Sequence, residues 1–294
     1  MLVTTFNRKE LTLNFLASLE KSMRNSNIEL DVIVIDDNSS DGTVLEINKS
    51  FPSVKIIRGT GFLYWSTSLR LAFFELGRDL ENYDGIFFAN DDIEVLDRAV
   101  DEIVEVAHRL NALVGGPVRT KTGDVEATGY RFGYVCRPKF RRILPNGSIR
   151  DCDVLPGHLL YMPIDIYSRI AVVGEVFSHG FTDFELSLNA RNLGIRRVAL
   201  GRYVGVIDKK HNYFREQAGV RLPVRQIIWR LRFNPKSPPI HEAVHYLRRV
   251  SKLMWPIWLI GFYLPHLISF IQSLFTIDIK RFISKYFLNK ELKI

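Results

Sequence analysis

Residues 86–95, IFFANDDIEV, constrain the fold of the chain most strongly. The first four residues are apolar, which predicts a buried β-strand. The strand ends in Asn90, Asp91 and Asp92, and adjacent carboxylates at the end of a hydrophobic strand are costly unless a cation compensates them. A divalent metal that holds a diphosphate would do so, because hard oxygen ligands suit Mg²⁺ and Mn²⁺. The alternative is an ordinary strand-end turn whose acids are solvated.

Strand and helix patterns alternate along the first two thirds of the chain, which predicts an open α/β sheet. Strands are expected at 2–5, 30–35, 54–57, 86–89 and 112–115. Amphipathic spacing predicts helices at 11–23, 43–49, 64–77, 97–110 and 181–193. Polar clusters follow several of these strands. Ligands of such sheets bind beyond the carboxyl ends of the strands, so we expect the clusters to meet at one sheet edge.

Residues 117–155 have a different pattern, with frequent Gly, Pro and basic residues and poor helical periodicity. We predict strands and hairpins here, close to an acceptor. A strand at 154–162 is interrupted by Gly157 and His158, and His158 is a candidate for the acceptor side. A short helix at 164–172 and a late strand at 197–205 complete the domain.

Charge and cysteine content narrow the choice of partner and compartment. The 294 residues carry a formal net charge of +8, which suits nucleic acid, anionic lipid or a phosphorylated small molecule. The sequence has no zinc-finger spacing and no compact basic and aromatic module, which disfavours nucleic acid. Cys136 and Cys152 favour a reduced cytoplasmic setting over a disulfide scaffold. The amino terminus lacks the pattern of a signal peptide.

The chain changes character from about residue 217. Basic helices are expected at 221–232 and 241–252, followed by an uncharged run at 253–277 with basic flanks. The run is long enough to span a membrane, although its prolines make an in-plane membrane element fit at least as well. A helical hairpin packed on the rest of the chain or on a second subunit is the alternative. We therefore predict an α/β domain at 1–215 and a membrane-associating helical tail at 216–294.

Four polar clusters occur in order: TTFNR at 4–8, DDNSSDGT at 36–43, NDD at 90–92 and TDFE at 182–185. A nucleotide could lie across the first three, with its base near the first two and its diphosphate at a metal. With these motifs, above all VIDDNSSDGT at 34–43, the chain resembles the family-2 glycosyltransferases over most of residues 2–212. The segment GTGFLYW at 59–65 is similar to one found in rhamnosyltransferase-like members of bacterial polysaccharide synthesis.

The resemblance implies a GT-A fold, in which a Rossmann-like nucleotide-binding sheet has helices on both faces. It implies that Asp92 binds Mn²⁺ or Mg²⁺, although the doublet leaves Asp91 open, and that His211 reaches the metal or diphosphate. When the TDFE motif is aligned with the corresponding family motif, Asp183 is the general base that deprotonates the acceptor hydroxyl. Family members usually have a second acid directly before this base, and this chain has Thr182 at that position. The residues expected to hold the nucleotide sugar are Thr4, Asn7, Arg8, Asp36, Asp37, Trp65, Asn90 and Asp91.

The function so implied is inverting transfer of a hexosyl or rhamnosyl group from a UDP- or dTDP-sugar. The expected acceptor is a polyprenyl-diphosphate-linked glycan or polysaccharide, in the synthesis of a bacterial surface glycan such as lipopolysaccharide O-antigen or capsule. The expected location is the cytoplasmic face of the inner membrane, as a peripheral, monotopic or single-spanning protein, with a homodimer left open. The alternative is an inactive nucleotide-sugar-binding or scaffold protein of a polysaccharide assembly complex.

Overall fold

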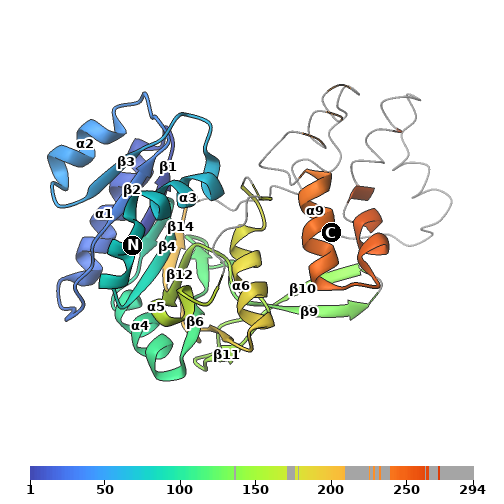
Figure 1. The fold of residues 1–294 in the computed structure, drawn as a ribbon. Coiled ribbons are helices and arrows are strands. Elements are labelled where there is room, and N and C mark those ends of the chain that lie inside the picture. The colour runs from blue at the N-terminus through green and yellow to red at the C-terminus, as the bar shows by residue number, and fades with distance from the viewer. Residues whose placement is uncertain are drawn as a thin grey trace. The chain divides into compact units, whose positions relative to one another are not determined.

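The computed structural model describes residues 1–135, 137–170, 176–177, 179–208, 225, 228, 232, 239–261, 263–264 and 271. The chain divides into two compact units, Met1–Lys210 and His211–Ile294 (Figure 1). The sequence predicted the boundary after residue 215, and the roles assigned to the two parts stay predictions.

An eight-stranded sheet forms the centre of the first unit, in the order β11-β13-β6-β12-β4-β1-β2-β3. Strands β4, β1, β2 and β3 run parallel to one another, and β12 runs antiparallel to both of its neighbours. The bounds are β1 Leu2–Thr5, β2 Ile33–Asp36, β3 Lys55–Arg58, β4 Gly85–Asn90, β6 Ala112–Gly115, β11 Arg150–Asp151, β12 Leu159–Pro163 and β13 Arg196–Ala199. The predicted strands at the start of the chain are therefore confirmed to within a few residues.

Helices cover both faces of this sheet, as the near-continuous apolar strands predict. The helices α1, α2 and α4 share one core cluster with Val3 and Val34, whereas α3, α5 and α6 share another with Leu2 and Ile35. Alternate residues of each strand thus face opposite helix layers. The bounds are α1 Lys9–Met23, α2 Thr43–Ser50, α3 Tyr64–Leu76, the 3₁₀ helix η1 Gly77–Asn82, α4 Ala99–Leu110, α5 Ile164–Tyr167 and α6 Thr182–Asn192.

The region from 117 to 155 forms strands and a hairpin, as predicted. A four-stranded sheet has the order β5-β14-β7-β8, and β9 pairs with β10 in an antiparallel hairpin. The bounds are β5 Ile93–Val95, β7 Val118–Thr120, β8 Val125–Ala127, β9 Tyr130–Val135, β10 Arg137–Arg142 and β14 Gly205–Ile207.

Two predicted strands differ in the structure. The strand expected at 154–162 begins only at Leu159, because the N–H group of Gly157 donates to the carboxylate of Asp183 and not to a neighbouring strand. The strand expected at 197–205 is divided into β13 and β14, which belong to different sheets. The segment between them passes from one sheet to the other: the N–H of Leu200 donates to the carbonyl oxygen of Gly115, and the N–H of Val204 donates to that of Pro117.

The second unit contains α9, Ile240–Val250, where the sequence predicts a helix at 241–252. Residues 255–261 are also helical, as are 263 and 264. Of the helix predicted at 221–232, only residues 225, 228 and 232 are described. Among the residues that the structure describes, no helix combines the length and the apolar content needed to cross a bilayer.

Candidate active site

The loops that follow β1, β2 and β4 meet at one edge of the large sheet. Thr5 lies opposite Asp36, and Thr4 lies opposite Asn90, so the three parallel strands end at the same level. The N–H of Asp37 donates to the carbonyl oxygen of Thr5 at 2.9 Å, which fixes the second loop beside the first. The predicted meeting of the first three polar clusters is therefore present in the fold.

Arg8 compensates the acidic pair that follows β4. Its guanidinium contacts Asp91 at 2.8 Å and Asp92 at 2.7 Å. The side chain of Asp91 is 2% exposed, that of Asp92 is 8% exposed and that of Arg8 is 36% exposed. Burial raises the pKa of Asp91 to about 6, although Arg8 opposes the shift. These two acids are therefore not the solvated turn residues of the alternative interpretation, and a cation accompanies them.

This donor set suits a metal that the substrate helps to hold. Among the described residues, no group of three His, Cys, Asp or Glu side chains is arranged to bind a metal. Mg²⁺ and related cations are commonly held by one or two carboxylates, and substrate phosphates complete their coordination. Asp92 and Asp91 can provide the carboxylates. His211, the other predicted metal ligand, lies outside the described residues.

Asp37 holds the loop that leads into α3. Its carboxylate accepts hydrogen bonds from the N–H groups of Gly61 at 2.7 Å, Leu63 at 2.8 Å and Tyr64 at 3.3 Å. A Cβ atom at Gly59 would lie 2.7 Å from one oxygen of this carboxylate, so the approach requires a glycine. Sequence reasoning did not identify this structural role. The predicted contact of Asp37 with a base or ribose stays a prediction.

Asp36 is buried at the end of β2. It is 0% exposed, and one carboxylate oxygen accepts a hydrogen bond from the N–H of Ser39 at 3.0 Å. The same oxygen is 3.4 Å from the guanidinium of Arg58. Asp36 therefore shapes the loop after β2, and its predicted contact with the nucleotide also stays a prediction.

Asn7 joins the loops after β1 and β2. Its side-chain oxygen accepts a hydrogen bond from the N–H of Ser40, and its own N–H donates to the hydroxyl of Ser39, both at 2.8 Å. The N–H of Lys9 donates to Asp41 at 2.9 Å and adds a third link. The DDNSSDGT motif is thus fastened to the TTFNR motif, which makes the two loops a single surface.

Asp183 lies at the start of α6, beside the end of β4. One carboxylate oxygen accepts from the N–H of Gly157 and the other from the N–H of Phe184, each at 2.9 Å. The carbonyl oxygen of His158 accepts from the N–H of Asn90 at 3.1 Å, so the Gly157 turn connects Asp183 to the acidic loop. Burial raises the pKa of Asp183 above its usual value, against the two hydrogen bonds and the charge of His158. A raised pKa suits a general base that works near neutral pH.

Trp65 packs against the same turn. A Cβ atom built on Gly157 would lie 2.9 Å from the indole ring of Trp65 and 3.4 Å from the Cβ atom of Asp183. The hydroxyl groups of Ser66 and Thr182 form a hydrogen bond that joins the first turns of α3 and α6. The structure therefore brings Trp65 and Asp183 together, although 59–65 and 182–185 are far apart in the sequence.

Four loops around this edge contain a residue with a left-handed backbone. The φ angles are 50° at Asn7, 62° at Asn38, 55° at Tyr64 and 63° at Phe181. Such conformations are costly for residues other than glycine and are often found at functional sites. Each of the four lies within two residues of a predicted site residue, which is consistent with a functional role for this edge.

An aromatic cluster, which the sequence did not predict, includes Phe184, the residue that follows Asp183. The ring centroids of Phe140 and Phe184 are 5.5 Å apart, and Tyr130 lies 6.0 Å from Phe184 and 6.1 Å from Phe140. All three side chains are partly exposed. Burial raises the pKa of Tyr130, although Arg142 opposes the shift. We call Tyr130, Phe140 and Phe184 the aromatic wall.

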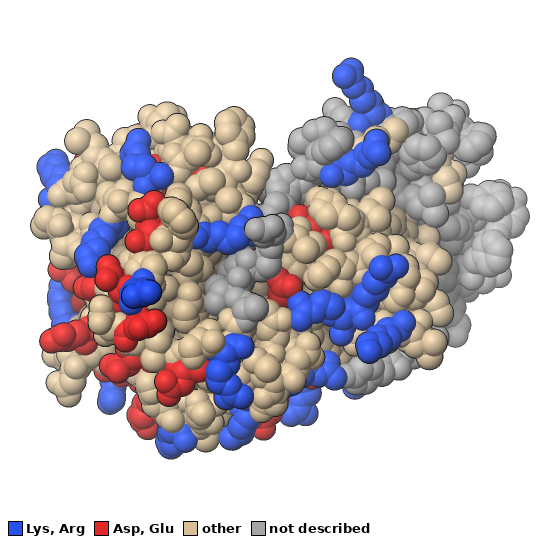
Figure 2. Space-filling model, viewed as in Figure 1, with Lys and Arg blue, Asp and Glu red and all other residues tan. Residues whose placement is uncertain are grey.

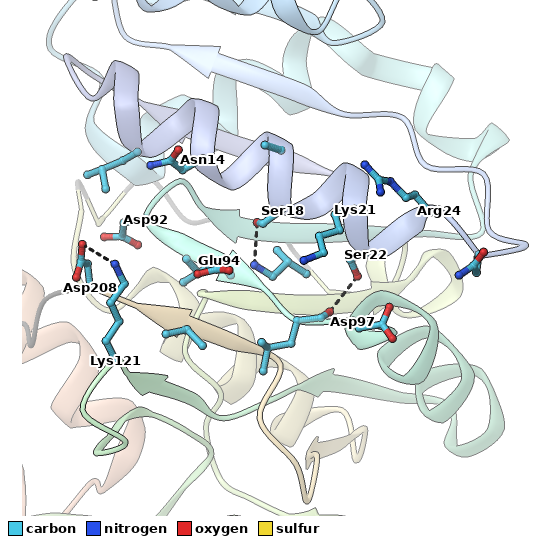
Figure 3. Close-up of a pocket in the computed structure, with 17 residues that line it drawn as sticks. Asn14, Ser18, Lys21, Ser22, Arg24, Asp92, Glu94, Asp97, Lys121 and Asp208 are labelled. Atoms are coloured by element: carbon cyan, nitrogen blue, oxygen red, sulfur yellow. Dashed lines mark hydrogen bonds and ion pairs between the residues drawn. The ribbon is translucent and has the colours of Figure 1, made fainter.

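A groove of about 800 Å³ lies between α1 and the strands β5 and β14 (Figure 3). Asp92 lines one end of it, together with Glu94 and an ion pair of 3.0 Å between Lys121 and Asp208. Asp37 and Asp183 do not line this groove. On the face shown in Figure 2, acidic and basic side chains are interspersed over the first unit. The groove is thus lined by both apolar and charged side chains, and it reaches the acidic loop from the α1 side.

The fold is an open α/β sheet whose acidic loops lie at the carboxyl ends of parallel strands, where such sheets bind their ligands. The family model "Glycosyl transferase family 2" matches residues 1–160, which is more than half of the chain. The chain belongs to glycosyl transferase family 2. No curated protein matches the chain.

Two solved structures have the same GT-A fold. The mannosyltransferase PcManGT from Pyrobaculum calidifontis, in complex with GDP-Man and Mn²⁺, is 14% identical with a TM-score of 0.51; the match covers 93% of this chain and 72% of that one. GalNAc-T7 with UDP, GalNAc and Mn²⁺ is 11% identical with a TM-score of 0.57, over 97% of this chain and 57% of that one. At these identities the likeness shows the fold alone.

Proposed function

We propose that the chain is an inverting glycosyltransferase that moves a sugar from a nucleoside diphosphate sugar to a glycan acceptor. The observation that carries this proposal is the single sheet edge that holds the acidic loop and Asp183, connected by the hydrogen bond between Asn90 and His158. Family membership and Mn²⁺-bound structures with the same fold support a divalent metal and a nucleotide-sugar donor.

Asp183 is the general base of the proposed reaction. It takes the proton of an acceptor hydroxyl while that oxygen attacks the anomeric carbon of the donor sugar. The bond from the acceptor oxygen to the anomeric carbon forms as the bond from that carbon to the diphosphate breaks. The nucleoside diphosphate leaves with the bonding electrons, and a single displacement inverts the anomeric carbon.

Asp92 is the proposed metal ligand of the pair. Asp91 is enclosed, because Thr12 donates to one of its oxygens at 3.2 Å and Arg8 contacts the other. Asp92 is the more exposed acid and also lines the groove. A bound Mn²⁺ or Mg²⁺ would neutralise charge on the departing diphosphate. Arg8 would contribute to the same stabilisation from the protein.

Aromatic side chains near Asp183 suggest where donor and acceptor bind. Trp65 follows the loop held by Asp37, which supports the proposal that it contacts the donor sugar. The aromatic wall includes Phe184, which directly follows Asp183, and it is proposed to contact the acceptor. Aromatic rings supply broad apolar contacts in ligand sites. Arg131, Arg141 and Arg142 are exposed on the same hairpin and suit an acceptor diphosphate.

Replacement of Phe140 by alanine should raise the KM for the acceptor about fivefold, because one aromatic contact contributes about 1 kcal/mol. Donor hydrolysis in the absence of acceptor should keep its rate. Phe74→Ala is the matched control, since Phe74 is 82% exposed and lies on α3 outside the wall. An equal loss of donor hydrolysis and transfer in Phe140→Ala would show that the wall supports the fold and not the acceptor.

The finer substrates follow from the sequence resemblance. We propose a UDP- or dTDP-linked hexose or rhamnose as donor and a polyprenyl-diphosphate-linked glycan as acceptor, in bacterial surface-glycan synthesis. The proposed place of work is the cytoplasmic face of the inner membrane, where such an acceptor would be presented. The basic and apolar composition of residues 216–294 supports this location. A homodimer stays a prediction.

An assay with a panel of nucleotide sugars tests the function. The full chain should release the nucleoside diphosphate from one preferred donor, with Mn²⁺ or Mg²⁺ present and not with EDTA. Stabilisation of the chain against heat by the same nucleotide is expected from binding linkage. Tight nucleotide binding without turnover on any acceptor pool would instead favour an inactive nucleotide-sugar-binding or scaffold protein.

A further inference from the structure

The segment after α9 has an exposed apolar surface. Leu253 is 84% exposed, Ile257 51%, Ile260 66% and Leu264 43%. Residues 255–261, 263 and 264 are helical. Of these four side chains, Ile257, Ile260 and Leu264 recur at intervals of three and four residues, which places them along one side of this helix, and Leu253 lies in the turn that precedes it. We call the four side chains the apolar stripe.

The preceding helix α9 shows how unusual this arrangement is. Ala243, Tyr246 and Leu247 of α9 are 0%, 1% and 2% exposed, and from residue 241 onward its exposed side chains, His241 and Arg248, are polar. Surface helices of globular proteins normally bury their apolar side in this way. The apolar stripe differs from such a helix, because its apolar side chains are exposed to solvent. A contiguous exposed apolar surface indicates a binding partner.

Basic and aromatic side chains lie at the beginning of the stripe. The guanidinium of Arg248 is 4.5 Å from the ring centroid of Trp255, a cation–π contact. Arg248 and Lys252 are both exposed. Tryptophan and basic residues are enriched where a protein meets lipid head groups, and each basic residue near an anionic membrane contributes attraction.

We infer that the apolar stripe inserts into the surface of an anionic lipid bilayer. The helix lies in the plane of the interface, with Leu253, Ile257, Ile260 and Leu264 toward the acyl chains and Arg248 and Lys252 beside lipid phosphates. Trp258 is 1% exposed and faces away from the stripe, so the opposite side of the helix is covered by protein. One apolar side and one protein-covered side are what an interfacial helix requires.

Lipid fits the stripe better than a second copy of the chain does. The whole chain carries a net charge of +8, and a second copy would bring the same basic residues toward the same stripe. An anionic membrane is complementary both to the apolar side chains and to Arg248 and Lys252. This inference refines the membrane location that belongs to the proposed function, and it concerns binding, so its test does not depend on catalysis.

Co-sedimentation of the full chain with lipid vesicles tests the inference. The chain should bind vesicles of phosphatidylcholine and phosphatidylglycerol more tightly than vesicles of phosphatidylcholine alone. The double variant Ile257→Ser, Ile260→Ser should lose about tenfold in partitioning for each isoleucine, because each loses the burial of a large aliphatic side chain. Leu45→Ser is the control: Leu45 is 74% exposed on α2, outside the stripe, and this variant should bind as the wild type does.

Two further measurements separate the possible outcomes. Arg248→Gln with Lys252→Gln should weaken binding to the anionic vesicles only, and added salt should have the same effect on the wild type. Thermal unfolding and nucleotide binding identify any variant that fails to fold. Unchanged vesicle binding by the folded isoleucine variant would overturn the inference. So would a wild-type dimer in light scattering that binds no vesicles and becomes monomeric in that variant, because the stripe would then belong to a second copy.

Discussion

Replacement of Asp183 by asparagine should reduce the rate of sugar transfer by about 10² to 10⁴, the range typical of a lost general base. The substitution keeps the size of the side chain and removes its ability to accept a proton. Nucleotide binding should change little, since the nucleotide is proposed to bind at the edge formed by the loops after β1, β2 and β4. Initial rates of transfer and calorimetric binding of the nucleoside diphosphate measure the two effects separately.

Asp165→Asn is the matched control, because Asp165 is exposed on α5 and the change in charge is the same. The control should transfer sugar at the wild-type rate. The pH profile adds a second test. Burial raises the pKa of Asp183, and a base must be deprotonated, so kcat/KM should fall as the pH drops through that raised pKa. Sugar transfer at the wild-type rate in Asp183→Asn would show that Asp183 is not the general base.

Replacement of Arg8 by glutamine should destabilise the free protein by about 2 to 3 kcal/mol at pH 7. Removing one partner of a fully buried ion pair typically costs about 3 to 5 kcal/mol, and a discount is needed because the side chain of Arg8 is 36% exposed. The variant leaves Asp91 and Asp92 without their cation. Chemical denaturation in the absence of divalent metal measures the loss.

The pH dependence of this loss has a definite sign. The pKa of Asp91 is raised from 3.8 to about 6 in the folded chain, so its contribution to stability is greatest below pH 4 and is lost as the pH rises through 6. Without Arg8 the folded pKa should rise further, because Arg8 opposes the shift. The loss of unfolding free energy in Arg8→Gln, relative to the wild type, should therefore become smaller as the pH is lowered from 8 to 5.

Arg196→Gln provides the comparison for Arg8→Gln. Arg196 pairs with Asp151 at 2.9 Å, with side chains that are 48% and 60% exposed. An exposed pair contributes at most about 1 kcal/mol, so this variant should be nearly as stable as the wild type. A deficit in Arg8→Gln no larger than that of Arg196→Gln, or one that does not vary with pH, would mean that Arg8 does not balance the buried acids.

The fold could be predicted from sequence wherever a local pattern decided the structure. The apolar run before Asn90 gave a strand because it is long enough only for a buried β-strand and ends in turn-forming residues. Gly194, with a φ of 71°, directly follows the helix predicted at 181–193, and such a glycine is a common end of a helix. The strand expected at 154–162 was predicted too early, because the contact of Gly157 with Asp183 spans a large distance in sequence and leaves no periodic signal.

The candidate site was predicted only in part, because some of its contacts follow from local patterns and others are formed by residues far apart in the sequence. The strand ends that carry Thr4, Asp36 and Asn90 meet because parallel strands share an edge, which a sequence can show. The packing of Trp65 on Gly157 depends on how α3 and α6 begin, and a single sequence does not reveal it. The aromatic wall was missed although Phe184 directly follows Asp183, because hairpin register decides which rings meet.

The most direct test of the proposed site is the crystal structure of the full chain with Mn²⁺ and its preferred nucleoside diphosphate. The anomalous signal of manganese locates the metal without assumptions about the protein. We predict a manganese peak bonded to a carboxylate oxygen of Asp92, with the nucleotide along the sheet edge between the loop held by Asp37 and the turn that holds Asp183. A manganese peak away from Asp92, or a nucleotide bound in the groove between α1 and β14 and remote from Asp37 and Asp183, would contradict this site.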